Sequence, residues 1–114
     1  MRKVYNLIGI AQRAGKTSSG ATAAQTSLTR NRAQVLLMSE DISPNTKELL
    51  LKSCRKRNIP WIILGSRYDL GTSMGKAYRV ALTINDAGIA SAIVKAIEAV
   101  DKDAKSMGVV EWPR

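Results

Sequence analysis

Two short apolar runs constrain this chain more than any other feature of its sequence. Residues 34–39 (QVLLMS) and 61–64 (WIIL) are almost wholly apolar, and each has the length of a strand. A continuous run of this kind is typical of a strand covered on both faces, because a strand with one wet face alternates apolar and polar residues. The sequence therefore predicts a sheet with helices on both sides, an α/β fold of the three-layer α/β/α sandwich type.

The segment between the two runs predicts a helix with well-marked ends. Ser43 can accept a hydrogen bond at the cap position, and Pro44 suits the first helical position. The helix is expected to continue to about Arg57, where Asn58 and Pro60 break it.

Hydrophobic spacing predicts the other elements of the fold. We expect helices over residues 2–14, 21–31 and 86–100, a helical turn between Gly71 and Gly75, an extended piece over 16–19 and a strand over 80–84. Residues 1–100 are thus predicted to form one domain around a central mixed sheet of about four strands. Residues 101–114 are expected to be a polar C-terminal tail.

The charge of the chain is large and unevenly distributed. Lys and Arg number 18 against nine Asp and Glu, which gives a net charge of +9 over 114 residues. Residues 1–39 carry six cations and no acid, whereas residues 80–114 carry four cations and five acids. A surplus concentrated in the first two-thirds predicts a binding face for a polyanion, nucleic acid or membrane surface. No apolar run approaches the length of a membrane span and the start does not resemble a secretory leader, so we expect a cytoplasmic protein without a membrane partner.

Catalytic machinery is not recognisable in the sequence. The chain has no His and a single Cys, Cys54, which removes the commonest general base and metal ligand. Gly15-Lys16-Thr17 imitates the end of a phosphate-binding loop but lacks the first glycine at the required spacing. The adjacent carboxylates Glu40 and Asp41 would point to opposite faces of an extended chain. We expect no enzyme, no cofactor and no metal.

Three glycine- or proline-containing loops are predicted to gather along one edge of the sheet, beside helix starts that favour anions. These loops span residues 15–20, 41–44 and 65–71, and they carry or flank Arg13, Lys16, Lys47 and Arg67, with Arg57 near them. Cations around closely approachable backbone suit structured RNA, which is recognised largely by shape, unstacked bases and 2′-hydroxyls. DNA is not expected as a partner.

Several short motifs occur together in a characteristic order. They are Arg13-Ala-Gly15-Lys16, Gly20 at a helix start, VLLMSEDISPNTK at 35–47, Cys54 to Trp61, Leu70 to Lys76, and Tyr78-Arg79-Val80. With these motifs, residues 4–95 resemble the ribosomal protein L7Ae/L30e family of kink-turn RNA-binding proteins, in particular its small bacterial, YlxQ-like members. The resemblance implies binding of the sharply bent internal loop of a kink-turn, possible association with the ribosome, and neither catalysis nor cofactor.

The resemblance also implies which residues would contact RNA. Phosphates would be held by Lys16, Lys47, Arg57 and Arg67, with Pro44 beside Lys47; Ser19, Gly20, Ala21, Thr22 and Ala23 would lie at the base edges; and Leu64, Gly65 and Ser66 would cover an unstacked nucleotide.

The chain departs from the family pattern in one place. Thr22, Ala23 and Thr26 stand where the family has Asn, Glu and Lys in its contacts to tandem G·A pairs. An alternative is therefore a protein-interaction module that keeps the fold and has lost kink-turn recognition.

Overall fold

The computed structural model describes residues 2–100, so the tail predicted for residues 101–114 lies outside the described residues. The elements are α1 (Arg2–Arg13), β1 (Thr17–Ser19), α2 (Ala21–Thr29), β2 (Val35–Met38), α3 (Pro44–Arg57), β3 (Trp61–Ile63), α4 (Arg67–Ser73), β4 (Ala81–Ile84) and α5 (Ala87–Val100). The strands form one sheet in the order β1-β4-β2-β3. Strands β2 and β3 are parallel, and β4 runs antiparallel to both β1 and β2. The mixed four-stranded sheet is confirmed.

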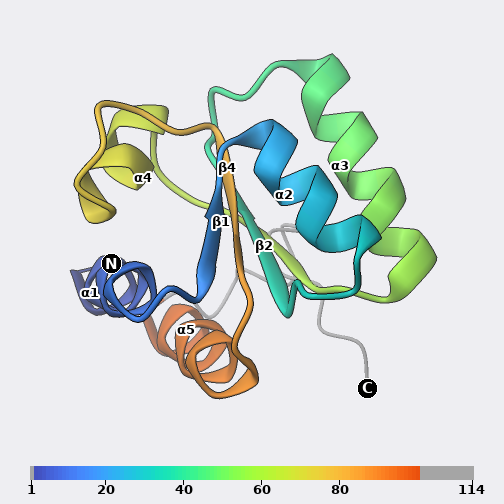
Figure 1. Ribbon diagram of the computed structural model, residues 1–114. Coiled ribbons are helices and arrows are strands. Elements are labelled where there is room, and N and C mark those ends of the chain that lie inside the picture. Colours follow the sequence, from blue (N-terminus) through green and yellow to red (C-terminus); the bar gives the residue numbers. More distant parts are fainter. Residues whose placement is uncertain (1, 101–114) are drawn as a thin grey trace.

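Helices cover both faces of this sheet, with α1, α4 and α5 on one face and α2 and α3 on the other (Figure 1). The packing of β2 explains why its sequence is apolar throughout. Val35 and Leu37 pack towards α1 and α5, whereas Leu36 and Met38 pack towards α2 and α3. Because successive strand side chains point to opposite faces, a sheet buried on both sides needs an unbroken apolar run. The three-layer α/β/α arrangement is confirmed.

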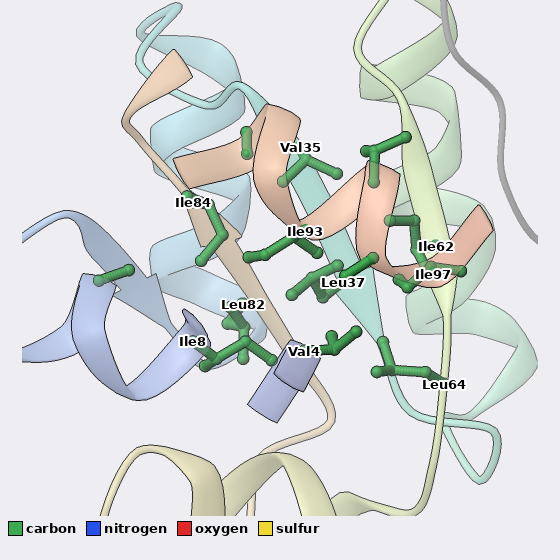
Figure 2. Packing of buried hydrophobic residues seen from close by; sticks show 14 of the residues in the cluster. Val4, Ile8, Val35, Leu37, Ile62, Leu64, Leu82, Ile84, Ile93 and Ile97 are labelled. Carbon is green, nitrogen blue, oxygen red and sulfur yellow. The ribbon is translucent and has the colours of Figure 1, made fainter. Parts of the chain in front are cut away.

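The core on the α1/α5 side joins residues from distant parts of the chain. Figure 2 shows side chains of α1 and α5 meeting those of the sheet, among them Val4, Ile8, Ile93, Ile97, Val35, Leu37, Leu82 and Ile84. Each of these side chains is at most 1% exposed. Removing this much apolar surface from water at about 25 cal/mol per Å² is the main favourable contribution to folding.

The predicted start of α3 is confirmed. The hydroxyl of Ser43 accepts the N–H of Thr46 at 3.3 Å, and Pro44 occupies the first turn. The helix ends at Asn58, whose φ of 55° is left-handed and whose N–H donates to the carbonyl of Cys54.

The prediction for residues 65–75 is wrong in its element boundaries. Helix α4 begins at Arg67, where we expected a loop, and ends at Ser73. A reciprocal capping box begins it: the Ser66 hydroxyl accepts the N–H of Asp69 at 3.1 Å, and the Asp69 carboxylate accepts the N–H of Ser66 at 2.9 Å. Two satisfied N–H groups are enough to begin the helix four residues before Gly71. The signal was present in the sequence as Ser66-x-x-Asp69.

Candidate nucleic-acid interface

Three helices begin at the same end of the sheet, which lies uppermost in Figure 1. The N–H of Ser39 donates to the carbonyl of Val80 at 2.9 Å, and the N–H of Glu40 donates to the carbonyl of Gly65 at 2.8 Å. Backbone hydrogen bonds thus hold the segments before α3, α4 and β4 together. We call this region the upper end, and it comprises residues 19–23, 39–47, 64–69 and 79–81.

Gly20 gives the start of α2 an open backbone. Its φ of 95° and ψ of 156° are accessible almost only to glycine, and its N–H donates to the carbonyl of Ala81 at 2.8 Å. A Cβ built at this position meets nothing within 4 Å, so the space in front of Gly20 is open. Another molecule can therefore approach the backbone closely here.

The first turn of α2 presents small residues and unused N–H groups. No side chain of the described residues caps this helix, so the N–H groups of Ala21, Thr22 and Ala23 remain available to an acceptor. Thr22 is exposed, and the two alanines are partly exposed. The positive end of the helix dipole favours an anionic or electron-rich group in front of this turn.

Lys47 brings a positive charge to the start of α3. Its side chain is partly exposed, whereas Pro44 one turn earlier is exposed. Both residues lie at the upper end, as expected from the sequence. The structure thus places these two residues and the start of α2 on one end of the molecule.

Arg67 also lies at the upper end, but a carboxylate already engages it. Its backbone N–H and its Nε donate to the Asp41 carboxylate at 3.0 and 3.3 Å, and its Nη2 donates to the Asp41 carbonyl at 2.9 Å. These bonds tie the start of α4 to the loop before α3. Part of the Arg67 charge is therefore neutralised within the protein.

The pKa of Asp41 is lowered by its neighbours. The Ser39 hydroxyl, which is buried and forms no hydrogen bond of regular geometry among the described residues, is the largest cause. Burial opposes the shift, and the backbone N–H and guanidinium of Arg67 add to it. The ionised form of Asp41 is thus favoured in the folded protein.

This shift predicts a loss of stability in acid. Because the folded carboxyl group binds a proton less readily than the unfolded one, its contribution is complete above the ordinary pKa of 3.8 and is lost as the pH falls through the lower folded value. We expect Asp41→Asn to have a flatter dependence of Tm on pH than the wild type below about pH 4. Thermal melts of both proteins between neutral and acid pH test this. Parallel curves would contradict it.

The segment predicted to cover a nucleotide is only partly available. The side chain of Leu64 is 2% exposed and packs in the core with Val4 and Ile62, so it does not reach the surface. Gly65 has a φ of 61° and is partly exposed, and the Ser66 hydroxyl is used in the α4 cap. The apolar run WIIL ends in the core, which is why Leu64 cannot cover a base. The prediction for its side chain is therefore corrected.

The opposite end of the sheet is formed by different loops. The N–H of Asn85 donates to the carbonyl of Lys16 at 2.7 Å, and the N–H of Gln34 donates to the carbonyl of Ile84 at 2.8 Å. Helices α2 and α3 both end here, and β1, β2 and β3 begin here (Figure 1). We call it the lower end, and it comprises residues 14–17, 30–34, 55–60 and 84–86.

Lys16 and Arg57 lie at this lower end, apart from the other predicted contact residues. Lys16 precedes β1, whereas Ser19 ends this strand and Gly20 follows it, so the strand separates Lys16 from them by about 10 Å or more. Arg57 ends α3, ten residues and therefore about 15 Å along the helix axis from Lys47. The expectation of one site containing all four cations is therefore corrected.

Sequence reasoning assigned no role to three residues that the structure places near the upper end. The Nε of Arg79 donates to the hydroxyl of Ser19 at 2.9 Å, which connects the segment before β4 to the start of α2. Tyr68 and Tyr78 are 63% and 53% exposed, and their rings lie edge to face at 6.5 Å. Tyr78-Arg79 was visible as a motif, but its place beside Ser19 depends on the antiparallel pairing of β1 with β4.

The part of the chain from residue 2 to residue 100 contains no group of three or more His, Cys, Asp or Glu side chains that could hold a metal ion. None of its helices combines the length and apolar character that crossing a bilayer requires. Cys54 is buried in the α2/α3 core.

The sandwich and its upper end define the class of protein. A family model described as "Ribosomal protein L7Ae/L30e/S12e/Gadd45 family" matches residues 2–94. The chain belongs to this family, as the sequence motifs indicated.

Particular relatives have names that concern RNA and the ribosome. The chain is 32% identical over 94 residues to "RNA-binding protein YlxQ" of Bacillus subtilis, covering 82% of this chain and 94% of the relative. It is 27% identical over 106 residues to "Large ribosomal subunit protein eL8" of Thermoplasma volcanium, covering 89% and 88%.

Solved structures share the fold. A protein of unknown function from Bacillus halodurans superposes with a TM-score of 0.81 at 29% identity, covering 84% of this chain and 97% of that one. The Giardia lamblia 15.5kD RNA binding protein superposes with a TM-score of 0.69 at 21% identity, covering 85% and 86%, which supports the fold alone.

Proposed function

We propose that this protein binds structured RNA through its upper end, without catalysis, in the cytoplasm and in association with the ribosome. The RNA class that fits best is the kink-turn, whose sharply bent internal loop exposes unpaired backbone and base edges. The observation that carries this proposal is the open backbone at Gly20. The family and the names of the relatives support RNA as the partner.

The upper end offers each kind of contact that such an RNA needs. Free N–H groups at the start of α2 can donate to phosphate or base oxygens, and the exposed Thr22 hydroxyl can both donate and accept. Lys47 brings a charge beside them, and the pairing of Arg67 with Asp41 fixes the neighbouring loop. Shape and backbone contacts therefore carry more of the binding here than paired hydrogen bonds to bases.

The test is direct binding to two RNAs at two salt concentrations. One RNA contains a kink-turn, and in the other both G·A pairs are replaced by Watson–Crick pairs. We expect the kink-turn RNA to bind at least about tenfold more tightly, since losing one good base-edge pair costs on the order of 1–3 kcal/mol by analogy with DNA. Equal affinity for both RNAs would contradict kink-turn recognition while leaving RNA binding in place.

A second function is favoured by a groove between α2 and α3. The groove has a volume of about 360 Å³. One of its lining residues, Leu49, is 61% exposed although its side chain is apolar. Such a surface suits an apolar segment of a partner protein. Its lining residues are Ala21, Thr22, Gln25, Thr26, Thr46, Leu49 and Leu50. Failure of the protein to bind either RNA would favour an interaction module over the first function.

A further inference from the structure

The positive charge of the folded domain is concentrated away from the upper end. The segments of the upper end hold three cations, Lys47, Arg67 and Arg79, and three acids, Glu40, Asp41 and Asp69. The segments of the lower end hold six cations, Lys16, Arg30, Arg32, Arg55, Lys56 and Arg57, and one acid, Asp86. The surplus of positive charge in the sequence therefore lies mainly at the lower end, opposite the proposed kink-turn site.

Most of these lower-end cations are free to meet a ligand. Arg55 is paired with Glu48 at 3.3 Å. Within the part of the chain that the structure describes, no hydrogen bond or ion pair engages the side chains of the other five. Lys16, Arg30, Arg32 and Lys56 are exposed, and Arg57 is partly exposed. Asp86 is occupied, because its carboxylate accepts the N–H of Ile89 at the start of α5.

Helix stability does not account for this many charges. Cations near the ends of α2 and α3 interact favourably with the helix dipoles, but each dipole amounts to about half a negative charge. One cation would balance both helices. Lys16 follows the end of α1, where its N–H donates to the carbonyl of Ala11 at 2.8 Å, and the dipole of that helix adds only about half a negative charge more.

The cations are spread across the lower end of the sheet. Lys16 precedes β1 and Arg57 lies before β3, and these are the two outer strands of the sheet. The two outer strands are three strand spacings apart, which is about 14 Å, and Arg57 itself lies in the helix layer because it ends α3. Arg30 and Arg32 lie between α2 and β2, in the middle of the order.

We propose that the lower end is a second RNA contact, which holds the phosphate backbone of a helix flanking the loop bound at the upper end. It would act without sequence preference, because long basic side chains at an exposed edge recognise charge rather than base edges. The ends are about 20 Å apart along α3, so one RNA reaches both only if it extends beyond the bent loop. The proposal rests on RNA as the partner but not on kink-turn recognition.

RNA fits this surface better than an anionic membrane does. A peripheral membrane site combines basic residues with apolar side chains that enter the bilayer. Within the described residues, the exposed large apolar side chains are Ile10, Leu49, Tyr68 and Tyr78, and none of them belongs to the lower end.

The experiment compares two variants that lose the same charge. The test variant is R30Q/R32Q/R57Q, and the matched control K3Q/K76Q/K95Q removes three exposed cations that lie outside both ends. Each is titrated over a range of salt concentrations with a kink-turn RNA that has long flanking helices and with a plain RNA duplex of the same length. Circular dichroism melts check that both variants are folded.

We expect the test variant to bind both RNAs at least about tenfold more weakly at low salt, with the slope of log affinity against log salt flattened by about 2 to 3. The control should stay within about threefold of the wild type, since dispersed charges act only through the weak overall field. Equal losses in both variants, or no loss in the test variant, would overturn the proposal. Loss of binding to phosphatidylserine vesicles with unchanged RNA affinity would identify a membrane site instead.

This experiment can contradict either proposal without contradicting the other. Equal wild-type affinity for the two RNAs contradicts kink-turn recognition, whereas the difference between the two variants decides the role of the lower end. A wild-type protein that binds neither RNA overturns both.

Discussion

Replacing Gly71 by alanine is expected to lower the free energy of unfolding by about 3 kcal/mol. A Cβ at this position would lie 2.5 Å from the Cα of Tyr78 and 2.7 Å from its backbone nitrogen. Real Cβ atoms do not approach backbone so closely, and backbone cannot rotate away as a side chain can. The segment before β4 would have to move off α4. For a domain of this size the loss corresponds to a fall in Tm of roughly 12–24 °C.

Gly88 provides the matched control. It is also helical, but it is exposed in the first turn of α5, where a Cβ meets only the flexible Asp86 carboxylate at 3.3 Å. Gly88→Ala should therefore leave stability unchanged or raise it by up to about 1 kcal/mol, the usual preference of a helix for alanine. Chemical denaturation of the two variants and the wild type measures both effects. A Gly71→Ala protein as stable as Gly88→Ala would show that α4 and the Tyr78 segment separate at little cost.

The effect of Gly71→Ala should extend to binding. The N–H of Arg79 donates to the carbonyl of Arg67 at 2.9 Å, so the segment that Gly71 packs against also supports the upper end. Displacing it would disturb the contact of Arg79 with Ser19. We expect weaker RNA binding by Gly71→Ala even where the protein remains folded.

The sequence was sufficient for the layers of the fold because the two-sided burial of β2 and β3 leaves a direct trace in it. Four consecutive apolar residues, Val35 to Met38, are needed only if both faces are covered. Caps explain the success at α3 and the error at α4. Ser43-Pro44 is a strong local signal, whereas Gly71 and Gly75 suggest limits for a helix that the capping box at Ser66 and Asp69 overrides.

The site was predictable only in part, because the composition of a loop does not show at which end of the sheet the loop lies. Lys16 and Gly20 are four residues apart, yet β1 lies between them and carries them to opposite ends. Arg57 is separated from Lys47 by nearly the full length of α3. The direction of β1 against β4 decides the first separation, and the length of α3 decides the second. The residue types can be read from the sequence, whereas strand direction and helix length decide which of them lie close enough to act together.

Restoring the family residues in α2 is expected to have the largest effect on recognition. The variant Thr22→Asn/Ala23→Glu/Thr26→Lys would regain the amide, carboxylate and ammonium that the family uses at tandem G·A pairs. Thr22 and Thr26 are exposed and one helical turn apart, and Ala23 is partly exposed, so the longer side chains fit without entering the core. One added base-edge contact at on the order of 1–3 kcal/mol predicts a gain of roughly 5- to 150-fold in kink-turn affinity.

The design separates recognition from charge, since the added Glu and Lys leave the net charge unchanged. The gain should therefore be confined to the kink-turn RNA, with the affinity for the Watson–Crick control and the slope against salt unaltered. Titrations of both RNAs with the wild type and the variant measure this. An equal gain on both RNAs would mean that the new Lys acts only on phosphates. No gain on either would mean that the start of α2 does not face the G·A pairs, and that Thr22 and Thr26 belong instead to the groove beside Leu49.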